Sequence, residues 1–260
     1  MPPRLLPPEI LDLIVDLLRD EPDALKACCL ASKSWLHRAR KRLFARVDFF
    51  YFDLELWKKA FPDPSNSPAH YTRNLTISTS EALASVGWIR AFSGLVRLQM
   101  GVCLCESHRG AFSPLDGSGG KISLVPLRGL SPTLKSLYLS HGSCISSSEI
   151  FGLVCSFPLL EDLSLVLPSS IEDDRGNIPS TSPRLTGCLD LDITDKIRPV
   201  VHRLLELPRG LHFSKVSMTY VDDDVELMMD LVSKCSDTLE YLGIYYYTGA
   251  FFCLSASVVG

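Results

Sequence analysis

The sequence predicts an α/β protein in which a short helical head precedes an array of strands and return segments. Three observations support this prediction. Helix signals crowd into residues 5–45. A Leu-x-x-Leu-x-Leu template then recurs along the chain, and its last four intervals are 26 or 27 residues long. Helical periodicity is present in several of the segments between the templates.

The first helix of the head is expected to begin at Pro8, because proline suits the first helical turn. Glu9 and Asp12 then place negative charge near the positive end of the helix dipole. The apolar residues recur at helical spacing and predict one stripe along the helix, formed by Ile10, Leu11, Ile14, Val15 and Leu18.

Two further helices are expected before residue 45. Pro22 and Asp23 precede a second, largely apolar helix that ends at Ala31. Ser32 or Ser34 can cap a third helix, which carries apolar residues on one side and basic residues on the other. Three helices of this length make a small core, so the exposed apolar surface favours a partner protein.

The residues of the head resemble an F-box. The pattern is Leu6-Pro7-x-Glu9-Ile10-x-x-x-Ile14, then Ala27-Cys28-x-x-Ala31-x-Lys33-x-Trp35, then Arg38 to Phe44. The resemblance implies that the head docks onto the Skp adaptor of a cullin–RING ubiquitin ligase. The other interpretation is that these are ordinary core residues of one larger domain. The adaptor contacts that the resemblance implies are Leu6, Pro7, Ile10, Leu11, Ile14, Leu30 and Trp35.

The composition is that of a folded protein, since 46% of residues are apolar and 22% are charged. The net charge of −4 gives no reason to expect nucleic acid as the main ligand. The first 50 residues carry nine Lys and Arg against seven Asp and Glu, and residues 38–46 hold much of that positive charge. This basic strip could meet an acidic partner or a nucleic acid, or it could be a solvated helix face.

The sequence shows no signal for secretion or membrane insertion, and a cytoplasmic or nuclear protein is expected. Acidic residues interrupt the early apolar run, so no signal peptide is expected. The apolar run near residues 250–254 is too short to cross a membrane. The nine cysteines show no disulfide framework, and free thiols in a reducing compartment are expected.

The chain divides into three parts. Residues 1–47 form the head, and residues 48–72 form a linker or packing segment. Its aromatic residues 49–52 predict a strand or a packing seam, and its prolines predict a loop. Residues 73–260 form the array. They begin another unit near residue 245 without a polar capping repeat, so we expect the chain to be truncated.

The templates of the array share a central apolar position. Each unit should supply a short strand and a return segment, with helices over residues 149–156, 197–207 and 225–235. The pattern resembles a degenerate leucine-rich repeat, and with the head it resembles F-box proteins of the fungal type. This implies an irregular curved solenoid with a parallel sheet. The central residues are Leu75, Leu98, Leu137, Leu163, Leu189, Val216 and Leu242.

Motifs for metal, nucleotide and nucleophilic chemistry are weak, so no cofactor, metal or catalytic residue is expected. Cys103, Cys105 and His108 are the best metal candidates, with His141 or Cys144 as a fourth ligand. Small buried thiols explain them better. The glycines before Lys121 lack the serine or threonine of a phosphate loop.

The resemblance predicts a substrate-recognition subunit of a Skp–cullin–F-box ubiquitin ligase, with the strands binding an unknown protein substrate. The chain itself is not expected to be an enzyme. A repeat scaffold outside any ligase is the alternative, and an enzyme ranks third. The strand residues between the inward positions would line the concave face: Arg97, Gln99, Tyr138, Asp162, Asp190, Asp192, Lys215, Tyr241 and Tyr245.

Overall fold

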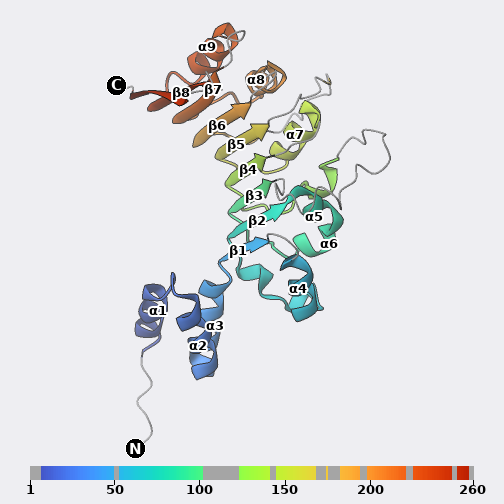
Figure 1. Cartoon of the computed structure of the whole chain (residues 1–260), viewed down its shortest axis with the longest axis vertical. Coiled ribbons are helices and arrows are strands. Elements are labelled where there is room, and N and C mark those ends of the chain that lie inside the picture. The colour runs from blue at the N-terminus through green and yellow to red at the C-terminus, as the bar shows by residue number, and fades with distance from the viewer. Residues whose placement is uncertain are drawn as a thin grey trace, which may run out of the picture.

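The protein is an α/β structure with a single open sheet (Figure 1). The computed structural model describes residues 7–49, 53–101, 123–140, 145–167, 174, 182–193, 198–220, 225–247 and 251–257. Nine strands pair in chain order. The first eight are parallel and the ninth is antiparallel to the eighth. The expected α/β class and parallel sheet are therefore confirmed.

Strands β2–β8 lie where the templates predict them, and the template positions set their register. Leu98 pairs with Leu75 on one side and with Leu137 on the other. The ladder continues through Leu163, Leu189, Val216 and Leu242. The strands are β1 (Arg46–Phe49), β2 (Asn74–Ser78), β3 (Arg97–Gly101), β4 (Ser136–Ser140), β5 (Asp162–Leu167), β6 (Cys188–Ile193), β7 (Lys215–Tyr220), β8 (Tyr241–Tyr247) and β9 (Phe251–Ser257).

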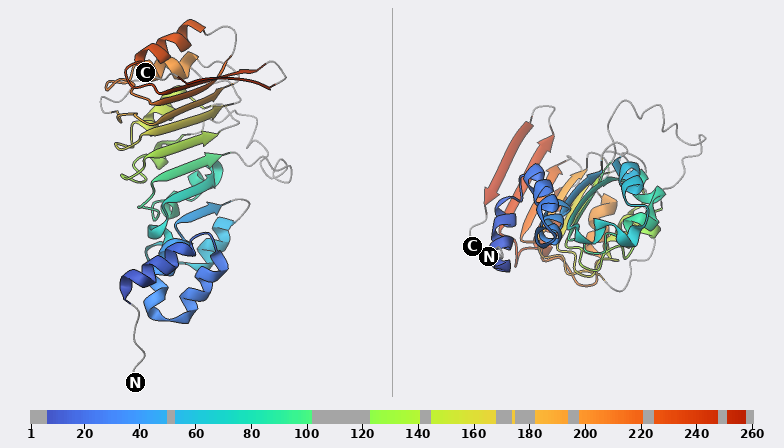
Figure 2. Two further views of the ribbon diagram at one scale, coloured as in Figure 1. Left: turned by 90° about the vertical axis from the view of Figure 1, so that its left-hand side faces the viewer. Right: turned by 90° about the horizontal axis from the view of Figure 1, so that it is seen from below.

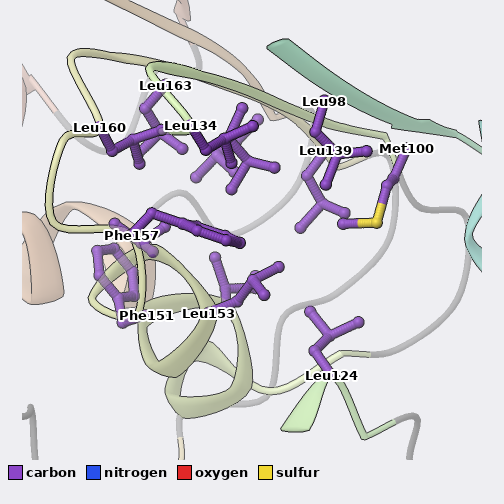
Figure 3. Packing of buried hydrophobic residues seen from close by; sticks show 14 of the residues in the cluster. Leu98, Met100, Leu124, Leu134, Leu139, Phe151, Leu153, Phe157, Leu160 and Leu163 are labelled. Atoms are coloured by element: carbon purple, nitrogen blue, oxygen red, sulfur yellow. The ribbon is translucent and has the colours of Figure 1, made fainter. Parts of the chain in front are cut away.

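The main core lies between the sheet and the return segments. Alternate strand residues point to the same face, and those at the central position and two residues later are buried in β2–β7. The first leucine of each template reaches the same core, as Leu134 and Leu160 do (Figure 3). Phe151 and Phe157 enter from the helical side. Each unit thus buries its apolar residues against its neighbours.

The return segments contain short helices on one face of the sheet (Figure 1). The three helices expected over residues 149–156, 197–207 and 225–235 are confirmed as α7 (Ser147–Val154), α8 (Arg198–Leu205) and α9 (Val225–Lys234). Ser146 caps α7, because its hydroxyl accepts a hydrogen bond from the Glu149 amide. The other helices of this layer are α5 (Thr79–Ala84), α6 (Val86–Ile89) and the 3₁₀ turn η4 (Val125–Leu127).

The head lies at the β1 end of the sheet (Figures 1 and 2). It consists of α1 (Pro8–Leu17), α2 (Pro22–Ala31) and α3 (Lys33–Leu43), as the sequence predicts. Ser32 occupies the position before α3, but its side chain makes no capping bond. The head has its own small core around Val15, Leu25 and Ala39.

The segment between head and array is structured. β1 already belongs to the sheet, and Phe49 is buried in the main core, so the sheet begins earlier than the templates do. After it come α4 (Asp53–Ala60) and the 3₁₀ turns η1 (Pro64–Asn66) and η2 (Pro68–Tyr71). The expected proline loop is therefore two capped turns, in which Asp63 and Ser67 accept backbone hydrogen bonds.

The last strand differs from the expectation of another parallel unit. β9 returns beside β8 in the opposite direction, with Tyr241 opposite Ser257 and Tyr247 opposite Phe251. The physical reason is the short connection of residues 248–250. A parallel neighbour needs a crossover of about a dozen residues, whereas a hairpin needs only a few.

Candidate protein-binding surfaces

The first surface consists of exposed apolar side chains on α1 and α2 of the head, and we call this set of side chains the head face. Ile10, Leu13 and Leu17 are 43%, 58% and 79% exposed. They are separated by three and four residues, so they lie on one side of α1. Leu30 on α2 is 87% exposed. Large apolar side chains that are gathered in so small a head favour contact with another protein.

The expected adaptor contacts fall into three groups. Pro7, Ile10 and Leu30 are exposed, and Ile14 and Trp35 are partly buried. Leu11 is buried in the head, at 6% exposure, and its role as an adaptor contact stays a prediction. Leu6 lies outside the described residues. Leu13 and Leu17 are not among the expected contacts, but both are exposed and lie at helical spacing from Ile10.

Charged residues join α1 to α3. Arg38 pairs with Asp12, and Arg42 pairs with Asp16. Lys41 and His37 lie next to these pairs and help to line a hollow of about 450 Å³. Two charges of the predicted basic strip are thus engaged in ion pairs with α1, which favours a structural role for this part of the strip.

The second surface is the sheet face turned away from α4–α9, which we call the open face. It lies on the inside of the curved sheet (Figure 1). Its residues form rows across the strands, and one row runs from Gln99 through Tyr138 and Ser164 to Asp190. All nine strand residues expected on the concave face are exposed or partly buried: Arg97, Gln99, Tyr138, Asp162, Asp190, Asp192, Lys215, Tyr241 and Tyr245.

Hydrogen bonds fix three carboxylates of the open face. The Asp162 carboxylate accepts from the Cys188 amide at 2.8 Å. Asp190 accepts from the Ser164 hydroxyl at 3.0 Å, and Asp192 accepts from the Thr219 hydroxyl at 2.9 Å. Neighbouring strands therefore hold these side chains in defined positions, where they can act as fixed acceptors for a partner.

The pKa is raised at four described thiols: Cys29, Cys155, Cys188 and Cys235. Burial raises the pKa of the Cys155 thiol to about 11. The pKa of Cys188 is also raised, chiefly because its thiol is partly desolvated although the residue is exposed, and secondly by the nearby charge of Asp162. A nucleophilic thiol needs the opposite shift. Within the described ranges, no three or more His, Cys, Asp or Glu residues gather as metal ligands would. Cys103, Cys105, His108, His141 and Cys144 lie outside those ranges.

A second hollow, of about 480 Å³, lies where β7 and β8 begin. Arg184, His212, Asp237 and Glu240 contribute charged or polar groups to its lining. Thr238 donates a hydrogen bond to the Phe213 carbonyl oxygen, so part of this lining closes the turn before β8. The hollow mixes both charge signs and favours no single ligand.

Comparison with models of known protein families and with curated proteins found no match for this chain. Among the described helices, none has the length and apolar character that crossing a membrane requires. The head face and the open face characterise the molecule as an α/β protein with exposed apolar side chains on a helical head and a polar, curved open sheet face.

Proposed function

We propose that the protein is a substrate-recognition subunit of a Skp–cullin–F-box ubiquitin ligase. The observation that carries the proposal is the head face, where Ile10, Leu13, Leu17 and Leu30 are exposed within the segment that resembles an F-box. Burying such side chains against the Skp adaptor would stabilise the complex by about 25 cal/mol for each Å² of apolar surface that is removed from water.

In this proposal the open face holds a protein substrate. It offers tyrosines beside fixed carboxylates, and aromatic residues with defined polar neighbours suit protein interfaces. Tyr138 and Asp190 share one row of the open face, and Tyr245 is 39% exposed near the β9 end. The chain would contribute no catalytic group. It would act by holding a lysine of the substrate near an E2 thioester, which raises the effective concentration of that lysine.

The junction between head and array supports this division of labour. Phe44, at the end of α3, packs edge-on against Trp57 of α4, with ring centroids 5.6 Å apart. Trp57 in turn packs against Phe49 of β1. The Tyr71 hydroxyl and His37 Nδ1 are also hydrogen-bonded at 3.0 Å. These contacts would keep the substrate surface at a set distance and angle from the adaptor.

The proposal is tested by measuring the affinity of the full chain for purified Skp adaptor. Leu30→Asp should weaken binding by at least about tenfold, because it places an unpaired charge in an apolar contact. Leu56→Asp is the matched control, because Leu56 on α4 is also exposed, at 62%, but lies outside the head. Adaptor binding that is equal in both variants, or absent in the unaltered chain, would overturn the proposal.

Reconstituted ubiquitin transfer separates the ligase from a scaffold. A complex that contains cullin, RING protein, E2 and this chain should transfer ubiquitin to a captured substrate. Binding to the adaptor without any transfer would favour the scaffold, a role in which the same head face is used outside a ligase.

A further inference from the structure

The outer edge of β9 is open in the structure. β9 is the last strand of the sheet, and no other strand in the described part of the chain pairs with its outer side. Its seven residues, Phe251–Ser257, pair with β8 along the inner side only. An edge strand presents a row of backbone N–H and C=O groups that another strand can satisfy.

The two edges of the sheet differ in their protection. β1 has only four residues, and its Arg46 and Asp48 form an ion pair at 3.1 Å. Short length and charge are devices that keep edge strands from pairing. Residues 251–257 contain no Asp, Glu, Lys, Arg or Pro. The β9 edge therefore lacks the devices that the β1 edge has.

We infer that β9 pairs antiparallel with β9 of a second copy of this chain, so that one sheet runs through a two-fold dimer. A two-fold axis perpendicular to the strands reverses the strand direction, so two identical edges related by it meet antiparallel. It also brings identical residues near one another, and like charges that face each other across strands are destabilising. The uncharged composition of β9 matches this requirement.

A second feature of the same end supplies apolar surface. Val225 and Met229 of α9, the helix of the last unit, are 46% and 62% exposed. They are four residues apart and so lie on one side of the helix. A stable interface buries at least about 1,000 Å², which is more than two seven-residue strands alone would bury. The exposed apolar residues of α9 would have to add to the contact. We therefore expect a dimer that dissociates on dilution.

The test places charges on β9 at positions that pair with open-face residues. Cys253 and Ser255 are opposite Tyr245 and Gly243 of β8. The double variant Cys253→Lys/Ser255→Lys should be monomeric at concentrations where the unaltered chain is dimeric, as measured by sedimentation velocity. Cys253→Glu/Ser255→Glu should behave in the same way. An equimolar mixture of the two variants should form a heterodimer, because opposite charges then face each other.

The control is Gln99→Lys/Ser140→Lys, which adds two charges on β3 and β4 inside the sheet and should leave the dimer intact. Circular dichroism checks that every variant is folded. A monomeric unaltered chain at all concentrations overturns the inference. So does a Lys variant that still dimerises, a mixture that stays monomeric, or a species that grows beyond the dimer. The result does not depend on adaptor binding by the head.

Discussion

Leu159 and Leu160 are adjacent in sequence but lie in different environments. Leu160 is fully buried in the main core, whereas Leu159 is 52% exposed (Figure 3 shows Leu160). Leu160→Ala should therefore lower the free energy of unfolding by about 2–5 kcal/mol, because it removes buried methyl groups and leaves a cavity. Leu159→Ala should change it by less than about 0.5 kcal/mol. Urea denaturation of both variants measures the difference, and equal effects would contradict the burial that separates them.

The cysteines provide a prediction about pH. Cys155 is buried with a pKa of about 11, whereas Cys188 is exposed on the open face. The thiolate is the reactive form, and below pH 9 Cys155 holds very little of it. Maleimide should therefore label Cys188 before Cys155, and labelling of both should accelerate as pH rises. Peptide mapping by mass spectrometry measures each rate. Faster labelling of Cys155 at pH 7 would show that its site opens to solvent.

At the residue scale, the sequence located the core of the array better than the exposed face of the head. Strand side chains alternate, so the template fixed that Leu98 and Met100 point inward and Gln99 outward. The apolar residues of α1 cover more than one side of the helix. Which of them are buried depends on how α1 packs in the folded head, and spacing alone did not separate Leu11 from Leu13.

At the scale of elements, aromatic packing joins the head to the array. Trp57 packs against Phe44 of the head and against Phe49 and Phe92 of the main core. Trp57→Ala should destabilise the protein by about 3 kcal/mol, because it empties this contact. It should also raise hydrogen exchange at the end of α3 and in β1.

The matched control is Leu56→Ala, since Leu56 is the exposed neighbour of Trp57 on α4. It should leave both the exchange rates and the unfolding curve unchanged. If Trp57→Ala destabilises the array but leaves exchange in α3 unaltered, the aromatic contact does not hold the head in place.

Element prediction succeeded where the periodic pattern was long and failed at the ends of the sheet. The return helices α7, α8 and α9 follow from apolar residues at helical spacing. β1 is short and carries Arg46 and Asp48, so no template signals it. The residues of β9 resemble the beginning of another unit, and only the short connection after β8 distinguishes a hairpin from a parallel strand.

At the scale of the whole molecule, the two hydrophobic cores are unequal. The main core extends from Val47 to Cys235 across the array. The core of the head has three fully buried apolar residues, Val15, Leu25 and Ala39, with five partly buried ones around them. Since stability grows with the apolar surface that a unit buries, the head should open more readily than the array.

Hydrogen exchange of the full chain tests this order and links it to the proposed partner. Amides of α1 and α2 should exchange at least about tenfold faster than those of β4 and β5, because the head has less buried surface to lose on opening.

A ligand that binds only the folded head stabilises it by about 2.7 kcal/mol at 100 times its dissociation constant. Skp adaptor at that excess should therefore slow exchange in the head by about 100-fold and leave β4 and β5 unchanged. Leu30→Asp should abolish this protection. If the head exchanged as slowly as β4 and β5 without any partner, its core would be as stable as that of the array. The head would then not be a unit of low stability that needs a partner.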